Sequence, residues 1–80
     1  MFINKAKDGR NNLCGEKIAE MRKNLRFSQR MLADQMQLMG LDLDKNAIQR
    51  IESGARFVTD IELQAFARYF GCMVDDLLRI

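Results

Sequence analysis

Apolar residues recur at intervals of three and four along most of the chain, the spacing that places side chains on one face of an α-helix. In the first such stretch, 15–25, the apolar positions are Ile18, Met21 and Leu25, and charged residues cover the other side. This pattern predicts an amphipathic helix. Phe27, just beyond it, is expected to be a buried anchor.

The next two helices are bounded by capping and stop residues. Ser28 offers an N-cap hydroxyl and Gly40 is a stop signal, so a second helix is expected to end at about residue 38 or 39. Asp44 and Gly54 bound a third helix in the same way. The inner positions of these two helices are Leu32, Ala33, Met36, Ala47, Ile48 and Ile51.

Two more helices follow. Thr59 and Glu62 have the spacing of a capping box, which predicts the start of a fourth helix that ends at Gly71. Its inner positions are Leu63, Phe66, Ala67 and Phe70. Residues 74–78 are expected to form a short fifth helix with Leu77 turned inward.

Composition supports a single small all-α domain. The 80 residues are 48% hydrophobic and 30% charged, without proline or tryptophan, a composition typical of a globular chain rather than a disordered one. We therefore expect a compact five-helix domain over 14–80, preceded by a flexible polar arm over 1–13. The basic residues of the arm, Lys5, Lys7 and Arg10, are candidates for phosphate contact, although a frayed and solvated terminus is the favoured interpretation.

Charge is unevenly distributed. Residues 1–56 carry 11 Lys or Arg against 7 Asp or Glu, whereas residues 57–80 carry 2 against 4. The basic part is suited to a polyanion and the acidic part would turn away from it. The net charge of only +2 makes this weak evidence when taken alone.

Several classes of function lack their usual residues. Cys14 and Cys72 do not have the spacing of metal ligands and the chain has no histidine, so no metal or other cofactor is expected and both cysteines are interpreted as packed thiols. Neither cysteine has an activating neighbour in sequence, which argues against catalysis. No apolar run approaches the ~20 residues that span a bilayer. We expect a cytoplasmic protein with no membrane contact and no small-molecule substrate.

Several residues of the predicted helices occur in an order and spacing that is typical of one protein family. The positions that carry it are Ile18, Met21, Arg22, Ser28, Gln29, Leu32, Ala33, Ile48, Ile51, Glu52, Gly54, Val58, Thr59, Asp60, Leu63, Ala67, Gly71, Leu77 and Leu78. In this order and spacing the set resembles the phage repressor/Cro-type helix-turn-helix family, also called the xenobiotic-response-element family. The resemblance covers about residues 15–78 and implies a compact lambda-repressor-like domain that binds duplex DNA, usually as a two-fold dimer.

The resemblance implies that the third helix, about 44–53, is the recognition helix, which lies in the major groove. Lys45, Asn46 and Gln49 are then the candidates for base contact, because lysine donates to guanine and side-chain amides pair with adenine. The alternative is that these polar residues only solvate an exposed helix.

Other residues take implied roles around this helix. Ser28 and Gln29 begin the second helix, whose free amides and positive dipole end suit a phosphate. Arg50 is expected to face phosphate, and three further arginines are either phosphate contacts or solvated surface charges: Arg26, Arg30 and Arg56. Arg22 and Glu52 are expected to form a partly buried ion pair that fixes the tilt of the third helix.

The chain departs from the usual family pattern at several places. The connection between the second and third helices is longer than the usual tight turn. Arg26 stands where a glycine often closes the first helix, so a positive φ is predicted there. Met73 stands where a capping serine is usual, which weakens the start of the fifth helix.

These observations predict a sequence-specific regulator, interpreted as a repressor that occupies a double-stranded DNA operator. A homodimer is expected, and its candidate surface comprises Met73, Val74, Leu78 and Ile80. The alternative is an antitoxin-like protein-binding module, whose partner would be a toxin or an antirepressor and in which DNA contact is secondary.

Overall fold

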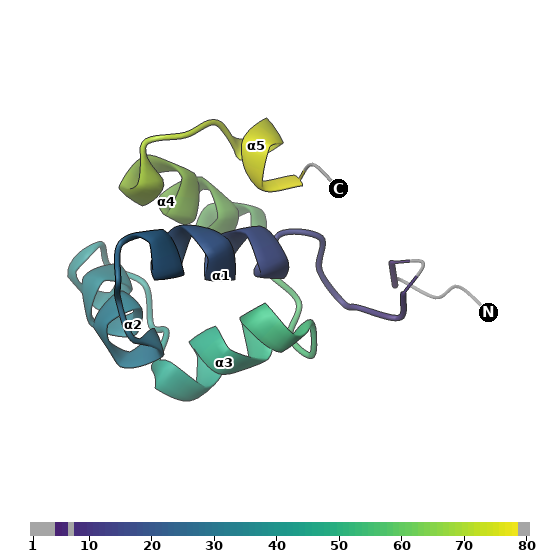
Figure 1. The fold of residues 1–80 in the computed structure, drawn as a ribbon, viewed down its shortest axis with the longest axis horizontal. Helices are drawn as coiled ribbons and strands as arrows, with labels where there is room; N and C mark the ends of the chain where they lie inside the picture. Colours follow the sequence, from purple (N-terminus) through teal and green to yellow (C-terminus); the bar gives the residue numbers. More distant parts are fainter. Residues whose placement is uncertain (1–4, 7, 79–80) are drawn as a thin grey trace.

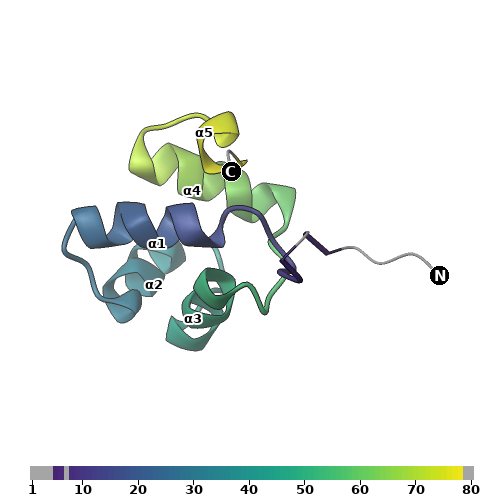
Figure 2. The ribbon, with the colours of Figure 1, turned by 45° about the vertical axis from the view of Figure 1, so that its right-hand side comes forward.

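The computed structural model describes residues 5–6 and 8–78. Within them lie five α-helices and no strand. The helices are α1 (Gly15–Asn24), α2 (Gln29–Leu38), α3 (Lys45–Ser53), α4 (Asp60–Phe70) and α5 (Val74–Leu78). Helix α1 lies between α4 and α5 on one side and α2 and α3 on the other (Figure 1 and Figure 2). The expected all-α five-helix architecture is confirmed.

The core is built mainly from the inner positions that periodicity selected. Its buried residues are Cys14, Ile18, Leu32, Ala33, Met36, Leu43, Ile48, Ile51, Phe66, Ala67 and Leu77. Two expectations fail beside the end of α1. Leu25 is 47% exposed because the helix has already ended at Asn24, and Phe27 is only half-buried, with its ring against Tyr69 at a centroid distance of 6.4 Å.

The caps predicted from sequence define three helix starts. Ser28 Oγ and Asp44 Oδ1 each accept a hydrogen bond from the backbone N–H three residues further on, at 3.1 and 2.8 Å. Thr59 Oγ1 accepts from the backbone N–H of Glu62 at 3.2 Å, and the Glu62 carboxylate accepts from the backbone N–H of Thr59 at 3.0 Å. These bonds satisfy N–H groups that have no partner within the helix.

Helices α1 to α4 are each followed by a residue in the left-handed region. Glycine takes this position after α2, α3 and α4, but Arg26, with φ of 60°, takes it after α1. The N–H groups of Arg26 and Phe27 bond back to carbonyls in the last turn of α1 at 2.9 and 3.1 Å, the arrangement of a Schellman motif. The predicted positive φ at Arg26 is confirmed. An arginine therefore adopts the left-handed conformation that glycine adopts at the least cost.

An ion pair fixes the turn between α3 and α4. Arg56 Nη1 and Nη2 lie 2.9 and 3.1 Å from the two carboxylate oxygens of Glu62. Burial acts to raise the pKa of Glu62, but the hydrogen bonds from Arg56 and Thr59 outweigh it, so the pKa lies below its ordinary value of 4.5. Glu62 therefore serves both the capping box and the turn.

A second, more buried ion pair joins three helices. Arg22 of α1 donates from Nε and Nη2 to the Glu52 carboxylate of α3 at 2.7 and 3.0 Å, and Gln29 Nε2 of α2 donates to the same carboxylate at 3.0 Å. Arg22 Nη1 also donates to the backbone carbonyl of Phe27 at 2.6 Å. The Arg22 and Glu52 side chains are only 11% and 9% exposed. The expected ion pair is present, and it holds α3 against α1 and α2.

Loss of either partner of this buried pair should destabilise the fold. We expect Arg22→Ala and Glu52→Ala each to lower the free energy of unfolding by about 3–5 kcal/mol, because each leaves an uncompensated charge with little access to water. Urea denaturation measures the change. Glu20→Ala is the matched control, since Glu20 pairs with Lys17 at 3.7 Å on an exposed surface, where the effect should stay below about 1 kcal/mol. Equal effects in all three variants would contradict this assignment.

Relief of the backbone strain at Arg26 should stabilise the protein. A left-handed conformation costs a non-glycine residue about 1–2 kcal/mol, and the extra unfolded-state freedom of glycine offsets about 0.5–1 kcal/mol of that gain. We expect Arg26→Gly to raise the free energy of unfolding by up to about 1 kcal/mol. Lys23→Gly, inside α1, should lower it by about 1 kcal/mol. A stability loss in Arg26→Gly would show that the arginine side chain matters more than the strain.

Acid should remove the contribution of the Arg56–Glu62 pair. Because the pKa of Glu62 is lowered in the folded protein, the stabilisation is fully present above the unfolded value and is lost as pH falls through the folded value. Glu62→Gln should therefore be less stable than the wild type at pH 7, and the gap should narrow below pH 4.5. Chemical denaturation across that range tests this, and a gap independent of pH would refute it.

Candidate nucleic-acid interface

Helix α3 presents a polar face to solvent. Ile48 and Ile51 are fully buried on its inner side, whereas Lys45, Asn46 and Gln49 are all exposed. The helix forms an outer edge of the molecule, on the opposite side of α1 from α4 and α5 (Figure 1). The three side chains that sequence selected for base contact are therefore on one accessible helix.

A shallow groove separates α3 from α2. It brings Arg30 of α2 to the same surface as Lys45 and Asn46 of α3. The remaining residues along it are Ala33, Asp34, Gln37 and Asp44. The start of α3 thus lies beside a cation of α2, with two carboxylates at the groove wall.

The long connection between α2 and α3 is firmly packed. Leu43 is completely buried in the core, and its carbonyl accepts a hydrogen bond from Gln37 Nε2 at 3.0 Å. Asp44 follows directly and caps α3. The extra length therefore ends in a fixed position, which determines where the first turn of α3 stands.

Most of the phosphate candidates lie at the surface. Arg26, Arg30 and Arg50 are exposed and form no ion pair with the described residues, and Ser28 is exposed at the start of α2. Gln29 is half-buried and donates one amide hydrogen to Glu52, which leaves its second N–H free.

Arg56 is held differently from the other arginine candidates. Sequence reasoning placed it among the candidate phosphate contacts, but both terminal nitrogens of its guanidinium are bonded to Glu62 and Nη1 also donates to the carbonyl of Phe57 at 3.0 Å. Its charge is paired within the domain, and its contact with phosphate stays a prediction. The sequence analysis assigned Glu62 to the capping box of α4 and did not predict that it also pairs with Arg56.

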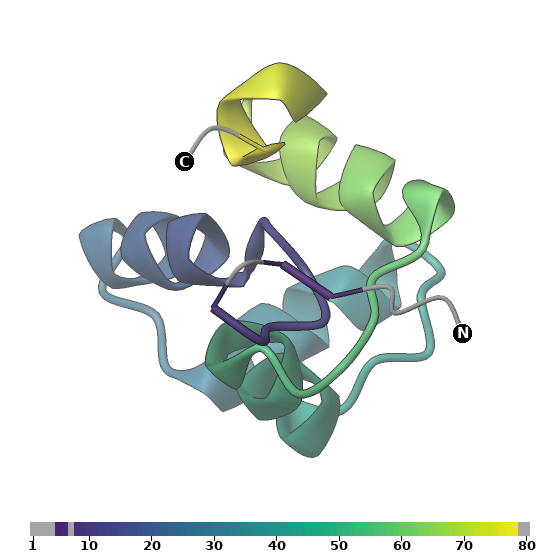
Figure 3. The same ribbon diagram turned by 90° about the vertical axis from the view of Figure 1, so that its right-hand side faces the viewer.

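The segment just before α1 contains polar residues whose contacts with α3 the sequence interpretation did not predict. Arg10, Asn11 and Asn12 donate hydrogen bonds of 2.7–3.0 Å to carbonyls in the last turn of α3 and the turn after it. The acceptor carbonyls belong to Ile51, Glu52, Gly54, Ala55 and Arg56. This part of the predicted flexible arm is anchored to the domain (Figure 3), whereas residues 1–4 and Lys7 lie outside the described residues. A run of strong donors preceding a helix was the signal available in the sequence.

The candidate dimer surface lies on the far side of α1 from α3 (Figure 1). Met73 is 71% exposed and Leu78 is 37% exposed, while Val74 is half-buried and Ile80 lies outside the described residues. Ile61 of α4, 68% exposed, lies with Val74 along a shallow groove. Apolar side chains thus meet solvent where α4 and α5 adjoin.

No group of three His, Cys, Asp or Glu side chains in the described part of the chain is placed to hold a metal ion, and no helix there is long and apolar enough to cross a membrane. Both cysteines are free. Burial raises the pKa of the Cys14 thiol to about 11, so it is a neutral packed group.

Comparison with known proteins agrees with this geometry. Residues 18–77 match the model of a protein family described as "Helix-turn-helix", and no curated protein and no solved structure matches significantly. The matched stretch includes all of α2, α3 and α4, and the family is one of DNA-binding regulatory domains rather than of enzymes. With five helices in the expected order and an exposed polar third helix, the chain belongs to the phage repressor/Cro-type helix-turn-helix family of DNA-binding transcription regulators.

Proposed function

We propose that this protein is a repressor that occupies a double-stranded DNA operator as a dimer and reads its sequence with α3. The observation that carries the proposal is the exposed polar face of α3, held from behind by the buried Arg22–Glu52 pair. The major groove is wide enough to admit an α-helix, and every base pair presents a distinct donor and acceptor pattern there.

Base recognition is assigned to the first two turns of α3. Lys45 and Asn46 occupy its first turn and Gln49 its second, and in helix-turn-helix proteins the N-terminal residues of the recognition helix contact base edges. Lys45 suits guanine O6 and N7, while Asn46 and Gln49 suit adenine N6 and N7. All three are exposed, so contact with a base requires no rearrangement of the core.

Phosphate contacts are assigned to the residues that flank this face. Arg26, Arg30 and Arg50 supply exposed cations, and Ser28 with the second N–H of Gln29 lies at the amino end of α2, where the helix dipole favours an anion. Each neutralised phosphate contributes about −0.9 to the slope of log K against log salt. Three arginine contacts would contribute about −2.7.

Dimerisation is assigned to the surface where α4 and α5 adjoin, with Met73, Val74 and Leu78. Its position across α1 from α3 leaves the α3 surfaces free (Figure 1). A two-fold dimer would read two half-sites about 34 Å apart, or at a multiple of that distance. Two copies also supply the contact area that one nine-residue helix lacks.

A protein-binding role is the second candidate function. Asp34 and Asp44 lie along the groove beside α3, and the net charge is only +2, both of which weaken attraction to a polyanion. In this case a toxin or an antirepressor would contact the same surface, and DNA contact would be secondary.

Selection of bound duplexes from a random pool, followed by titration of single variants, tests the main proposal. We expect Asn46→Ala and Gln49→Ala each to weaken binding to the selected duplex by about 1–3 kcal/mol, or about 5- to 150-fold, with little change on a scrambled duplex. Arg30→Ala should weaken binding to both duplexes alike and reduce the salt slope by about 0.9. Arg68→Ala, an exposed cation of α4, is the matched control and should change neither.

Two readouts separate the candidates. A two-fold symmetric consensus would support the dimer and the operator together. Duplex binding that is insensitive to salt and unaltered by Lys45→Ala and Gln49→Ala would reject base reading by α3 and favour the protein partner.

A further inference from the structure

The carboxyl end of α3 is held by a segment that precedes α1. In the described structure Arg10, Asn11 and Asn12 bond to backbone carbonyls of this end rather than to α1 alone, and Figure 3 shows the segment passing across it. We call Arg10–Asn12 the N-terminal clip.

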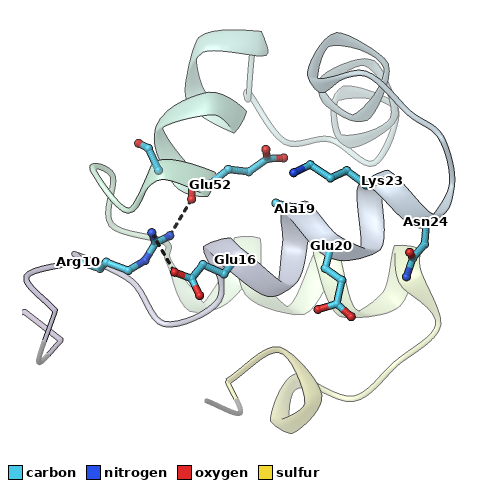
Figure 4. Close-up of a pocket in the computed structure, with 8 residues that line it drawn as sticks. Arg10, Glu16, Ala19, Glu20, Lys23, Asn24 and Glu52 are labelled. Carbon is cyan, nitrogen blue, oxygen red and sulfur yellow. Dashed lines mark hydrogen bonds and ion pairs between the residues drawn. The ribbon is translucent and has the colours of Figure 1, made fainter.

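Arg10 joins the first turn of α1 to the last turn of α3. Its Nη2 donates to the backbone carbonyl of Glu52 at 2.8 Å, and its Nη1 lies 3.6 Å from the Glu16 carboxylate. Figure 4 shows the guanidinium between these two groups. The carboxyl end of a helix carries partial negative charge, so a cation that is only 17% exposed is well placed there.

Asn12 makes three hydrogen bonds with its side-chain amide. Oδ1 accepts from the backbone N–H of Gly15 at 2.8 Å, at the start of α1. Nδ2 donates to the carbonyls of Ile51 and Arg56 at 3.0 and 2.7 Å. One small side chain thereby links the first residue of α1 to both sides of the turn after α3.

The chain is closely packed at Gly15 and Gly54, under the clip. A Cβ on Gly15 would overlap the carbonyl oxygen of Ile51, and a Cβ on Gly54 would lie 2.8 Å from the side chain of Arg10. Backbone atoms of α1 and α3 are therefore in direct contact at this point.

We propose that Arg10 and Asn12 are positioning residues for DNA recognition, which set the angle at which α3 enters the major groove. The inference rests on the proposed function. Without the clip, the last turn of α3 would keep the Glu52 side-chain contacts to Arg22 and Gln29 but lose its tie to the start of α1. A small change in the tilt of α3 then moves Lys45, Asn46 and Gln49 relative to the base edges, while the exposed arginines still reach phosphate.

Arg10 and Asn12 are not placed to contact phosphate directly. The guanidinium of Arg10 is mostly buried and already bonded, and the donor groups of Asn12 point at carbonyls of the domain. The clip should therefore affect the preference for one sequence over another, and not the general attraction to DNA.

Asn12→Asp and Arg10→Gln are the test variants. Asn12→Asp keeps the oxygen that accepts from Gly15 but replaces the two donated hydrogen bonds with an oxygen that faces two carbonyls. Thr59→Ala is the control, because it removes the N-cap bond of α4 and lowers the melting temperature without touching the clip. Affinity for the selected duplex and for a scrambled duplex of the same length is measured at one salt concentration, below every melting temperature.

We expect the preference for the selected duplex to fall about tenfold in Asn12→Asp, the equivalent of one good base contact. Affinity for the scrambled duplex and the salt slope should stay unchanged, and Arg10→Gln should act in the same direction. Amide hydrogen exchange without DNA should be faster at Gly54 and Ala55 in Asn12→Asp. Thr59→Ala should retain the wild-type preference and the wild-type exchange at these amides.

Three results would overturn the proposal. A lower melting temperature with an unchanged preference would make the clip merely structural. Equal weakening on both duplexes, with the salt slope reduced by about 0.9, would make it a phosphate contact. Unchanged exchange at Gly54 and Ala55 would show that the clip does not hold α3. If the wild type prefers no duplex at all, the proposed function fails, and the exchange result alone then decides whether the clip orders α3.

Discussion

The Glu52 carboxylate is the constraint on which the placement of α3 depends. It accepts three hydrogen bonds, two from Arg22 of α1 and one from Gln29 of α2, so one side chain relates three helices to each other. A carboxylate that is 9% exposed is costly to bury without such partners. The arrangement therefore opposes any large rotation of α3, since a large rotation would break these charge-assisted bonds.

Because α3 is held from its inner side, its outer side chains remain exposed to solvent. Ile48 and Ile51 form its buried face. The Asp44 cap and the buried Leu43 fix its start. Lys45, Asn46 and Gln49 on its outer face are exposed. The acidic side chains of α5 and the exposed apolar side chains of Met73 and Leu78 lie on the other side of α1. A face suited to an anionic partner and a face suited to an apolar one are therefore separated by the body of the domain.

Helix boundaries and the fold were predictable because their signals are local. A capping hydroxyl or carboxylate acts on an N–H three residues away, and a left-handed residue acts on the turn beside it, so Ser28, Asp44, Thr59 and Gly54 could be interpreted without coordinates. The positive φ of Arg26 was predictable from the family likeness, because a glycine often stands at this position. Leu25 was assigned to the wrong environment because periodicity does not reveal that a helix has already ended one residue earlier.

The sequence alone determined the five helices, the apolar residues that form the core and, through the family likeness, the Arg22–Glu52 pair. Only the tertiary structure decided which charged and polar groups are free. Arg56 is paired with Glu62 whereas Arg30 is exposed to solvent. The residues next to them in the sequence do not indicate which of the two arginines is paired. Arg10 bonds to a carbonyl 42 positions away, and Asn12 to one 44 positions away. Such partners meet only after the helices have packed, since hydrogen bonds and ion pairs depend on distances of a few ångströms that local sequence does not encode.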